Sequence, residues 1–219
     1  MAIALVAHSS VTNAQDTTGV DTTGANLIVI LIAGGSDITP TDNKSNTYTG
    51  LTIHSQGGDD SRLWYCYNPT VGTDHTFKQT WSYECLFAAA FSGVAASPFD
   101  QENGSNTAGA TSLQPGSITP SEDNCLIVTG LMAGNSNSNH AVNDGFTITN
   151  SINGVNGVNY GGAMAYLIQT TATAANPTHS WTSSVVAALS IASFKGTGGG
   201  GSTSIKDIIG GFGIIPFAR

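Results

Sequence analysis

Charge is scarce in this sequence, since only 9% of its 219 residues are Asp, Glu, Lys or Arg. Charged residues make up roughly a quarter of a typical soluble domain. Six basic residues stand against 14 acidic ones, which gives a formal net charge of −8, and the basic residues are scattered along the chain. Binding to a phosphate backbone requires clustered cations. We therefore expect no direct contact with nucleic acid.

Long apolar runs and helical periodicity are lacking as well. No segment reaches the ~20 apolar residues that span a bilayer, so no membrane partner is expected. The apolar start lacks a basic region and is interrupted by His8, which predicts a first strand rather than a signal peptide. The chain is then expected to be made in a cytoplasm. No stretch before residue 203 repeats apolar residues at helical spacing, so no helix is predicted there.

Cysteines are few and show no metal-ligand spacing. An odd count of three, at Cys66, Cys85 and Cys125, argues against a disulfide framework or a zinc site. Cys66 and Cys85 fall on two strands that we predict to be neighbours, so either a cross-strand bridge or three buried thiols would fit. Nucleophile, phosphate-binding and dinucleotide motifs are missing too. We predict no enzyme activity, no catalytic residue, no cofactor and no metal.

Strand patterns dominate what is present. Residues 27–32 and 85–91 are continuous apolar runs, which are typical of strands covered on both faces. Residues 47–53 and 146–149 alternate, as expected of strands with one face in water. Together these patterns predict an all-β fold, a β-sandwich of jelly-roll type. The predicted strands lie near residues 3–8, 26–33, 47–54, 62–68, 75–81, 84–93, 111–113, 125–132, 146–151, 162–170, 178–182 and 185–194.

The order of these landmarks recurs after about 100 residues, which is the signature of an internal repeat. Residues 26–34 return as 124–134, 50–53 as 145–148, 75–77 as 179–181, and 89–93 as 192–196. We predict one β unit over residues 1–196, with pseudo-repeated halves at about 26–93 and 124–196. The stretch 95–117, rich in Gly and Pro, reads as a linker or a long surface excursion.

Histidines and tryptophans are the first candidates for chemistry. His75 and His179 occupy equivalent places in the two halves, so they could form a functional pair or simply begin two strands. Trp64, Trp81 and Trp181 could form a platform on which sugars stack, or could pack in the core.

Acidic pairs are the second set of candidates. The pairs are Asp59 with Asp60, Asp100 with Glu102, and Glu122 with Asp123, all in turn-rich segments. A glycosidase needs two acids at a fixed separation, and no pair has a recognisable context for that role. The acidic loop at residues 100–103 could hold calcium through its oxygens, or could simply be solvated.

The C-terminal region differs in kind from the rest. Residues 197–204 are rich in Gly and Ser and predict a flexible tether, and the apolar residues 205–219 follow it. Docking back onto its own domain would make the tether unnecessary, so we expect the segment to dock onto a partner. The predicted docking residues are Ile205, Ile208, Ile209, Phe212, Ile214, Ile215 and Phe217.

Residues 86–94 and 190–195 resemble segments of β-sandwich proteins encoded by tailed phages and prophages. Residues 75–77 and 97–100 add to the likeness. The resemblance implies a non-enzymatic virion structural protein, such as a capsid decoration or cement protein or a head- or tail-attached fibre component. Its partners would be other virion proteins, its location the virion, and its state a homo-oligomer.

Two other classes of function stay open. A carbohydrate-binding module or adhesin would account for the abundance of Asn, Thr and Ser and for the tryptophans, with surface glycans as partners. A glycoside-acting enzyme on a jelly roll would require a cleft with paired acids.

Overall fold

A computed structural model describes residues 1–35 and 37–198 of the chain. The described residues form fourteen strands and no helix, so they contain no helix that could cross a membrane. The all-β prediction is confirmed. The strands are β1 (Ala4–Thr12), β2 (Leu27–Gly34), β3 (Thr41–Asp42), β4 (Thr49–Gly50), β5 (His54–Gln56), β6 (Asp59–Tyr67), β7 (Phe77–Lys78), β8 (Cys85–Ser92), β9 (Val94–Leu113), β10 (Cys125–Ala133), β11 (Ala141–Val142), β12 (Thr147–Ile152), β13 (Gly161–Gln169) and β14 (His179–Gly196).

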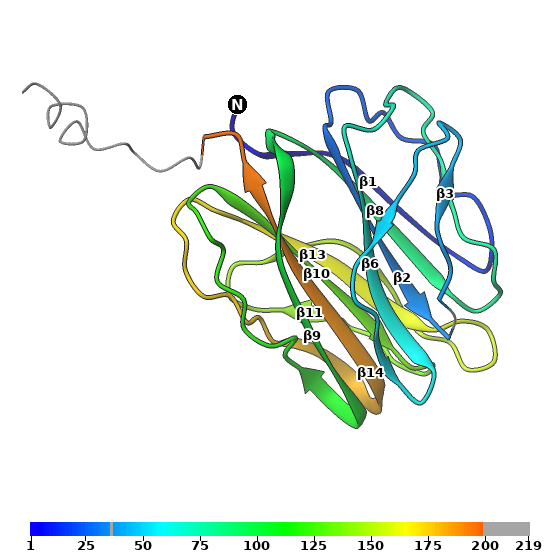
Figure 1. Ribbon diagram of the computed structural model, residues 1–219. Helices are drawn as coiled ribbons and strands as arrows, with labels where there is room; N and C mark the ends of the chain where they lie inside the picture. Colours follow the sequence, from blue (N-terminus) through cyan, green and yellow to red (C-terminus); the bar gives the residue numbers. More distant parts are fainter. Residues whose placement is uncertain (36, 199–219) are drawn as a thin grey trace, which may run out of the picture.

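The strands form two similar larger sheets that face each other as in a β-sandwich (Figure 1). The first sheet has the order β1-β8-β2-β6-β4, with β5 also on β6. The second has the order β11-β14-β10-β13-β12, with β9 also on β14. Strands β3 and β7 make a separate pair. Each large sheet therefore collects its strands from one part of the chain.

The main core lies between the two sheets. Alternate side chains of β2, such as Leu27 and Leu31, meet Val128 of β10 and Phe87 of β8 in one buried cluster. A Cβ atom at Gly130 would lie 2.5 Å from the Leu31 side chain, so the missing side chain lets β10 approach β2. Tight packing of this kind is the source of most of the stability of a sandwich.

A buried polar contact also joins the sheets. Ser61 of β6 donates a hydrogen bond to the carbonyl oxygen of Gly130 at 2.9 Å. Its hydroxyl also lies 3.0 Å from that of Ser190 on β14. Each buried hydroxyl therefore has a partner, as the interior requires.

The outer faces of both central strands are covered by connecting segments. On β2, Ile28 and Ile30 pack against Phe77 and other side chains from the loops. On β10, Ile127 packs against Phe146, and Leu131 packs in a separate cluster. Every residue of β2 and β10 is therefore buried, which agrees with the continuous apolar sequence of β2 and the mostly apolar sequence of β10.

The lateral edges of the two sheets lie next to each other. At one side β1 contacts β12, where His8 Nδ1 lies 2.7 Å from Asn150 Oδ1. At the other side β5 contacts β9, and Glu102 accepts hydrogen bonds from the backbone and hydroxyl of Thr52 at 2.8 and 2.9 Å. Edge strands shielded in this way are poor templates for pairing with other chains.

Strand β9 departs from the sequence prediction. Residues 95–117 read as a linker or excursion, but most of them belong to a 20-residue strand that pairs with β14. The Gly, Asn and Ser residues of this segment have low strand propensity, and β14 supplies the backbone partners that offset it. Four register shifts interrupt the pairing. Likewise, residues 178–182 and 185–194 join into β14, and the predicted strand 75–81 shrinks to β7.

The predicted neighbourhood of two cysteines is wrong. Cys66 on β6 and Cys85 on β8 are separated by β2, and all three cysteines are free. Burial raises the pKa of Cys85 to about 12 and that of Cys125 to about 11. Both therefore stay neutral thiols that fill the interior. The predicted docking residues between 205 and 219, and most of the tether, lie outside the described residues.

The contact between the sheets yields a stability prediction. Replacing the fully buried Leu31 by Ala should lower the free energy of unfolding by about 2 to 5 kcal/mol, because it leaves a cavity between β2 and β10. The exposed Val6→Ala variant should change it by less than ~0.5 kcal/mol. Urea denaturation of both variants measures the difference, and equal losses would contradict the assigned core.

Candidate functional site

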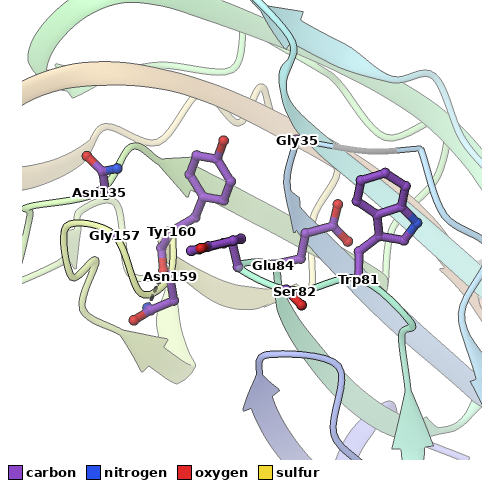
Figure 2. Close-up of a pocket in the computed structure, with 9 residues that line it drawn as sticks. Gly35, Trp81, Ser82, Glu84, Asn135, Gly157, Asn159 and Tyr160 are labelled. Carbon is purple, nitrogen blue, oxygen red and sulfur yellow. Dashed lines mark hydrogen bonds between the residues drawn. The ribbon is translucent and has the colours of Figure 1, made fainter.

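A pocket of about 250 Å³ opens where β2 and β10 end. The loop after β2, the loop before β8, the loop after β10 and the loop before β13 all contribute to it (Figure 2). The residues that line it are Gly35, Trp81, Ser82, Tyr83, Glu84, Asn135, Gly157, Asn159 and Tyr160. The pocket thus combines aromatic, amide, hydroxyl and carboxyl groups from distant parts of the chain.

The rim of the pocket is aromatic and exposed. Trp81 is 58% and Tyr83 is 51% exposed, and Val155 and Val158 in the loop before β13 are also exposed. The two loops are joined by a hydrogen bond from the Tyr160 amide to the Tyr83 carbonyl oxygen at 2.8 Å. Scattered apolar residues on a surface are normal, but a gathered group marks an interaction site.

The loop before β8 is held in an unusual conformation. Tyr83 has a φ of 77°, which is rare for a bulky residue. The Tyr83 amide donates to Asn13 Oδ1 at 3.2 Å, and the Trp81 amide donates to Gln79 Oε1 at 2.6 Å. These bonds fix the backbone that presents the two aromatic side chains. Backbone strain of this kind is concentrated at functional sites.

Glu84 lies at the base of the pocket, between Trp81 and Tyr160 in Figure 2. Its side chain is almost fully buried. A Cβ atom at Gly34 would overlap the Glu84 side chain, so Glu84 occupies space that any larger residue at position 34 would fill. The glycine at the end of β2 is therefore what admits a carboxyl group here.

Asn159 and Tyr160 form the opposite wall. The Asn159 amide donates to the carbonyl oxygens of Asn153 and Tyr160 at 2.8 and 2.5 Å. The Tyr160 hydroxyl donates to Asp59 Oδ1 at 2.9 Å. Burial and this hydrogen bond raise the pKa of Tyr160 to about 12, so the hydroxyl stays protonated at neutral pH.

Carboxylates give this end of the molecule a negative potential. Burial raises the pKa of Asp60, and the nearby carboxylates of Asp37 and Asp59 raise it further. Glu84 and Asp60 also act on Tyr160 in the same direction. Arg62 forms an ion pair with Asp37 and offsets part of this charge. The site should therefore disfavour anionic ligands.

The structure does not bring His75 and His179 together. His75 belongs to the covering of the outer face of the first sheet, where it stacks on Phe77 with ring centroids 4.4 Å apart. His179 lies beside Thr129 of β10, with 3.3 Å between Nε2 and Oγ1. The side chain of Thr129 points away from the core between the sheets, so the two histidines are on opposite sides of the sandwich.

His75 does form a local polar chain. Its Nδ1 atom lies 2.8 Å from Thr22 Oγ1, and its Nε2 atom lies 3.1 Å from Asp42 Oδ2. Burial alone would raise the pKa of Asp42, but hydrogen bonds led by that from His75 hold it well below its usual range. The order of hydroxyl, imidazole and carboxylate resembles a catalytic triad. Because Thr22 and His75 are fully buried, no substrate reaches them, and the chain anchors loops instead.

The tryptophans do not form a common platform. Trp64 and Trp181 are buried in separate clusters on the outer faces, as the core interpretation predicts. Trp81 contradicts that interpretation, because it is exposed beside the pocket.

The sequence did not indicate the other main residues of the pocket, which are Tyr83, Glu84, Asn135, Asn159 and Tyr160. Two aromatic residues in the turn Trp81-Ser82-Tyr83 are the one signal that could have indicated the rim.

At least one member of each acidic pair accepts a hydrogen bond within the fold, Asp59 from Tyr160 beside the pocket, and no member of the pairs lines the pocket. Asp100 accepts hydrogen bonds from Ser121 and Ser193, and Glu102 holds Thr52. Asp123 accepts one from the Ala172 amide at 2.8 Å. Among residues 1–35 and 37–198, no group of three or more His, Cys, Asp or Glu side chains could hold a metal ion. Residues 100–103, which were expected to form an acidic loop, belong to strand β9.

Comparison with protein-family models, with curated proteins and with solved structures found no match to this chain.

The buried His179 predicts a pH dependence of stability. Burial, with a smaller contribution from His140, lowers the pKa of His179 to about 3. Below pH ~6.5 the unfolded chain binds a proton that the folded chain does not, so stability should fall as the pH drops from 6.5 towards 3. The slope is about 1.4 kcal/mol per pH unit for one proton.

Chemical denaturation between pH 7 and pH 4 measures this slope. The variant His179→Gln should be less stable at pH 7. Its free energy of unfolding should change with pH by about 1.4 kcal/mol per unit less than that of the parent chain. An unchanged slope would show that His179 is protonated within the fold.

Proposed function

We propose that this chain is a non-enzymatic virion structural protein that is attached through its C-terminal segment and presents the pocket end outward. The observation that carries the proposal is the position of the pocket relative to the last described residues. The Thr197 amide donates to the Gly93 carbonyl oxygen at 2.8 Å, and the amino group of Met1 donates to Thr197 Oγ1 at 3.0 Å. This is the end at which β2 and β10 begin, whereas the pocket lies where they finish (Figure 1).

The distance between the two ends supports such a role. β2 has eight residues, and a strand rises about 3.3 Å per residue. A chain tethered at one end would therefore hold the pocket roughly 25 Å farther from the point of attachment. The resemblance of residues 86–94 and 190–195 to phage β-sandwich proteins points to a particle as the attachment partner. Self-association into a homo-oligomer through the tail is part of the same proposal.

The repeat in the sequence supports a finer reading of the fold. The three central strands have the order β8-β2-β6 in the first sheet and β14-β10-β13 in the second. We infer that residues 26–93 and 124–196 are structurally equivalent halves, each of which supplies the three central strands of one sheet. A jelly roll receives less support from this order, because its successive strands cross between the two sheets.

The non-enzymatic part of the proposal rests on the sequence and on the burial of the polar clusters. The sequence contains no recognised nucleophile motif, and the buried cluster of Thr22, His75 and Asp42 is closed to substrate. In the pair of Asp100 and Glu102, both carboxylates accept hydrogen bonds within the fold.

Truncation after Gly201 tests the attachment. The shortened chain should keep the melting temperature of the full chain, because residues 1–198 contain both sheets. It should be lost from purified particles of the encoding virus, since each buried Ile or Phe side chain of the removed segment would contribute ~1.5 to 3 kcal/mol before ordering costs.

Quantitative mass spectrometry of the particles measures occupancy. The full-length Lys206→Ala variant is the control, and it should be incorporated normally because it leaves the apolar residues in place. A truncated chain that reaches full occupancy would rule out the segment as the anchor.

A further inference from the structure

We propose that the pocket between Trp81 and Tyr160 binds the terminal ring of a neutral or amino-bearing sugar. This site goes beyond a structural role on a particle, because it assigns a ligand to the end of the sandwich opposite Thr197. The aromatic rim would contact the ring faces, and the polar lining would contact the hydroxyl groups.

The pocket has both apolar and polar lining residues, and a sugar ring likewise has both apolar and polar surfaces. A pyranose has apolar C–H faces and a rim of hydroxyl groups. Exposed aromatic rings such as Trp81 and Tyr83 offer flat apolar surfaces with polar edges. Ser82 and Asn135, both exposed and both in the lining, offer a hydroxyl and an amide. Specific small-molecule sites combine an apolar lining with a few placed polar groups in this way.

The rim is also preorganised. The positive φ of Tyr83 and the bonds from Trp81 and Tyr83 to Gln79 and Asn13 fix the loop before any ligand arrives. A loop whose backbone is already fixed loses less entropy on binding. Trp81 and Tyr83 are each more than half exposed and belong to no core cluster, so the strained loop is better explained by recognition than by packing.

The size of the pocket limits the ligand. A volume of about 250 Å³ falls below the ~300 to 1,000 Å³ of sites for drug-sized molecules. The pocket therefore suits one ring at the end of a glycan rather than an internal stretch of a long chain.

Charge narrows the ligand class further. Glu84 lies in the lining, and Asp59 accepts the hydrogen bond of Tyr160 on the opposite wall. Carboxylates this close to the ligand site repel sugars that carry a negative charge, such as sialic acids, uronic acids and phosphorylated sugars. They favour neutral rings, and they favour a protonated amino group still more.

A protein partner is the competing occupant, because Val155 and Val158 are also exposed in the loop that contributes Gly157 and Asn159 to the lining. The buried carboxyl group of Glu84 at the base of the pocket argues against it, since a protein core contact excludes charged groups. The sugar is therefore the ligand that we commit to.

Saturation-transfer NMR and a glycan array on the purified full-length chain test the proposal. The NMR probes are galactose, N-acetylglucosamine, glucosamine and N-acetylneuraminic acid. We expect at least one neutral or amino sugar to bind with a dissociation constant on the order of millimolar, as is usual for a ligand with few atoms. N-acetylneuraminic acid should give no signal.

Three variants locate the site. Trp81→Ala and Tyr83→Ala should each weaken binding about tenfold or more while the melting temperature stays near that of the parent chain. Tyr67→Ala is the matched control, because Tyr67 is a 38% exposed aromatic residue at the far end of β6. Glu84→Gln should reduce any preference for glucosamine over N-acetylglucosamine.

Several results would overturn the proposal. One is the absence of any array or NMR signal, and another is preferential binding of sialylated glycans. Binding that survives both rim variants would place the sugar elsewhere. Loss of self-association in Trp81→Ala without any sugar signal would assign the rim to a protein partner. None of these measurements uses a particle, so their failure leaves the attachment proposal standing, and failed incorporation leaves the sugar site untouched.

Discussion

The double burial of β2 and β10 is the constraint on which the rest of the molecule depends. Both strands are apolar on both faces, so each requires cover on two sides. One side of each is covered by the other sheet, and Gly130 allows the close approach. The second side has to be covered by the connecting segments. In a chain without helices among its described residues, loops perform the task that helices perform in α/β proteins.

That requirement explains the polar chemistry of the loops. A segment packed against a sheet must satisfy its own backbone and polar groups away from water. The cluster of Thr22, Asp42 and His75 does this for the loops over β2, where Asp42 also accepts a hydrogen bond from the Tyr48 hydroxyl at 2.5 Å. On the other face, His179 bonds to Thr129. Equivalent positions in the sequence thus hold histidines with different partners but a similar structural task.

Much of the fold could be predicted from the sequence because its central strands are local patterns. Continuous apolar runs at residues 27–32 and 85–91 identify buried strands without any knowledge of their partners. β9 could not be predicted in the same way, because it becomes a strand by pairing with β14, which lies far along the chain. Asn103, for example, pairs with Ile191, 88 residues later. The prediction that Cys66 and Cys85 lie on neighbouring strands fails for the same reason. β2, which comes earlier in the chain, lies between their two strands.

The candidate site was harder to predict than the fold, because it is assembled from four loops. Trp64, Trp81 and Trp181 look alike in the sequence, and only the packing of the outer faces decides which one is left exposed. Buried Phe77 and Gln79 hold the start of the loop, so the chain must turn outward before it re-enters the fold at Cys85. Trp81 and Tyr83 fall within that outward turn.

The same loop carries features that stability alone would not require. A glycine at 83 would adopt the positive φ without strain, and an apolar residue at 84 would avoid burying a carboxyl group. The chain instead has Tyr83 and Glu84 at these two positions. Departures from local preference that offer no gain in packing are found where a protein meets its ligand. Both departures fall in the one loop before β8, at the end of the sandwich opposite Thr197.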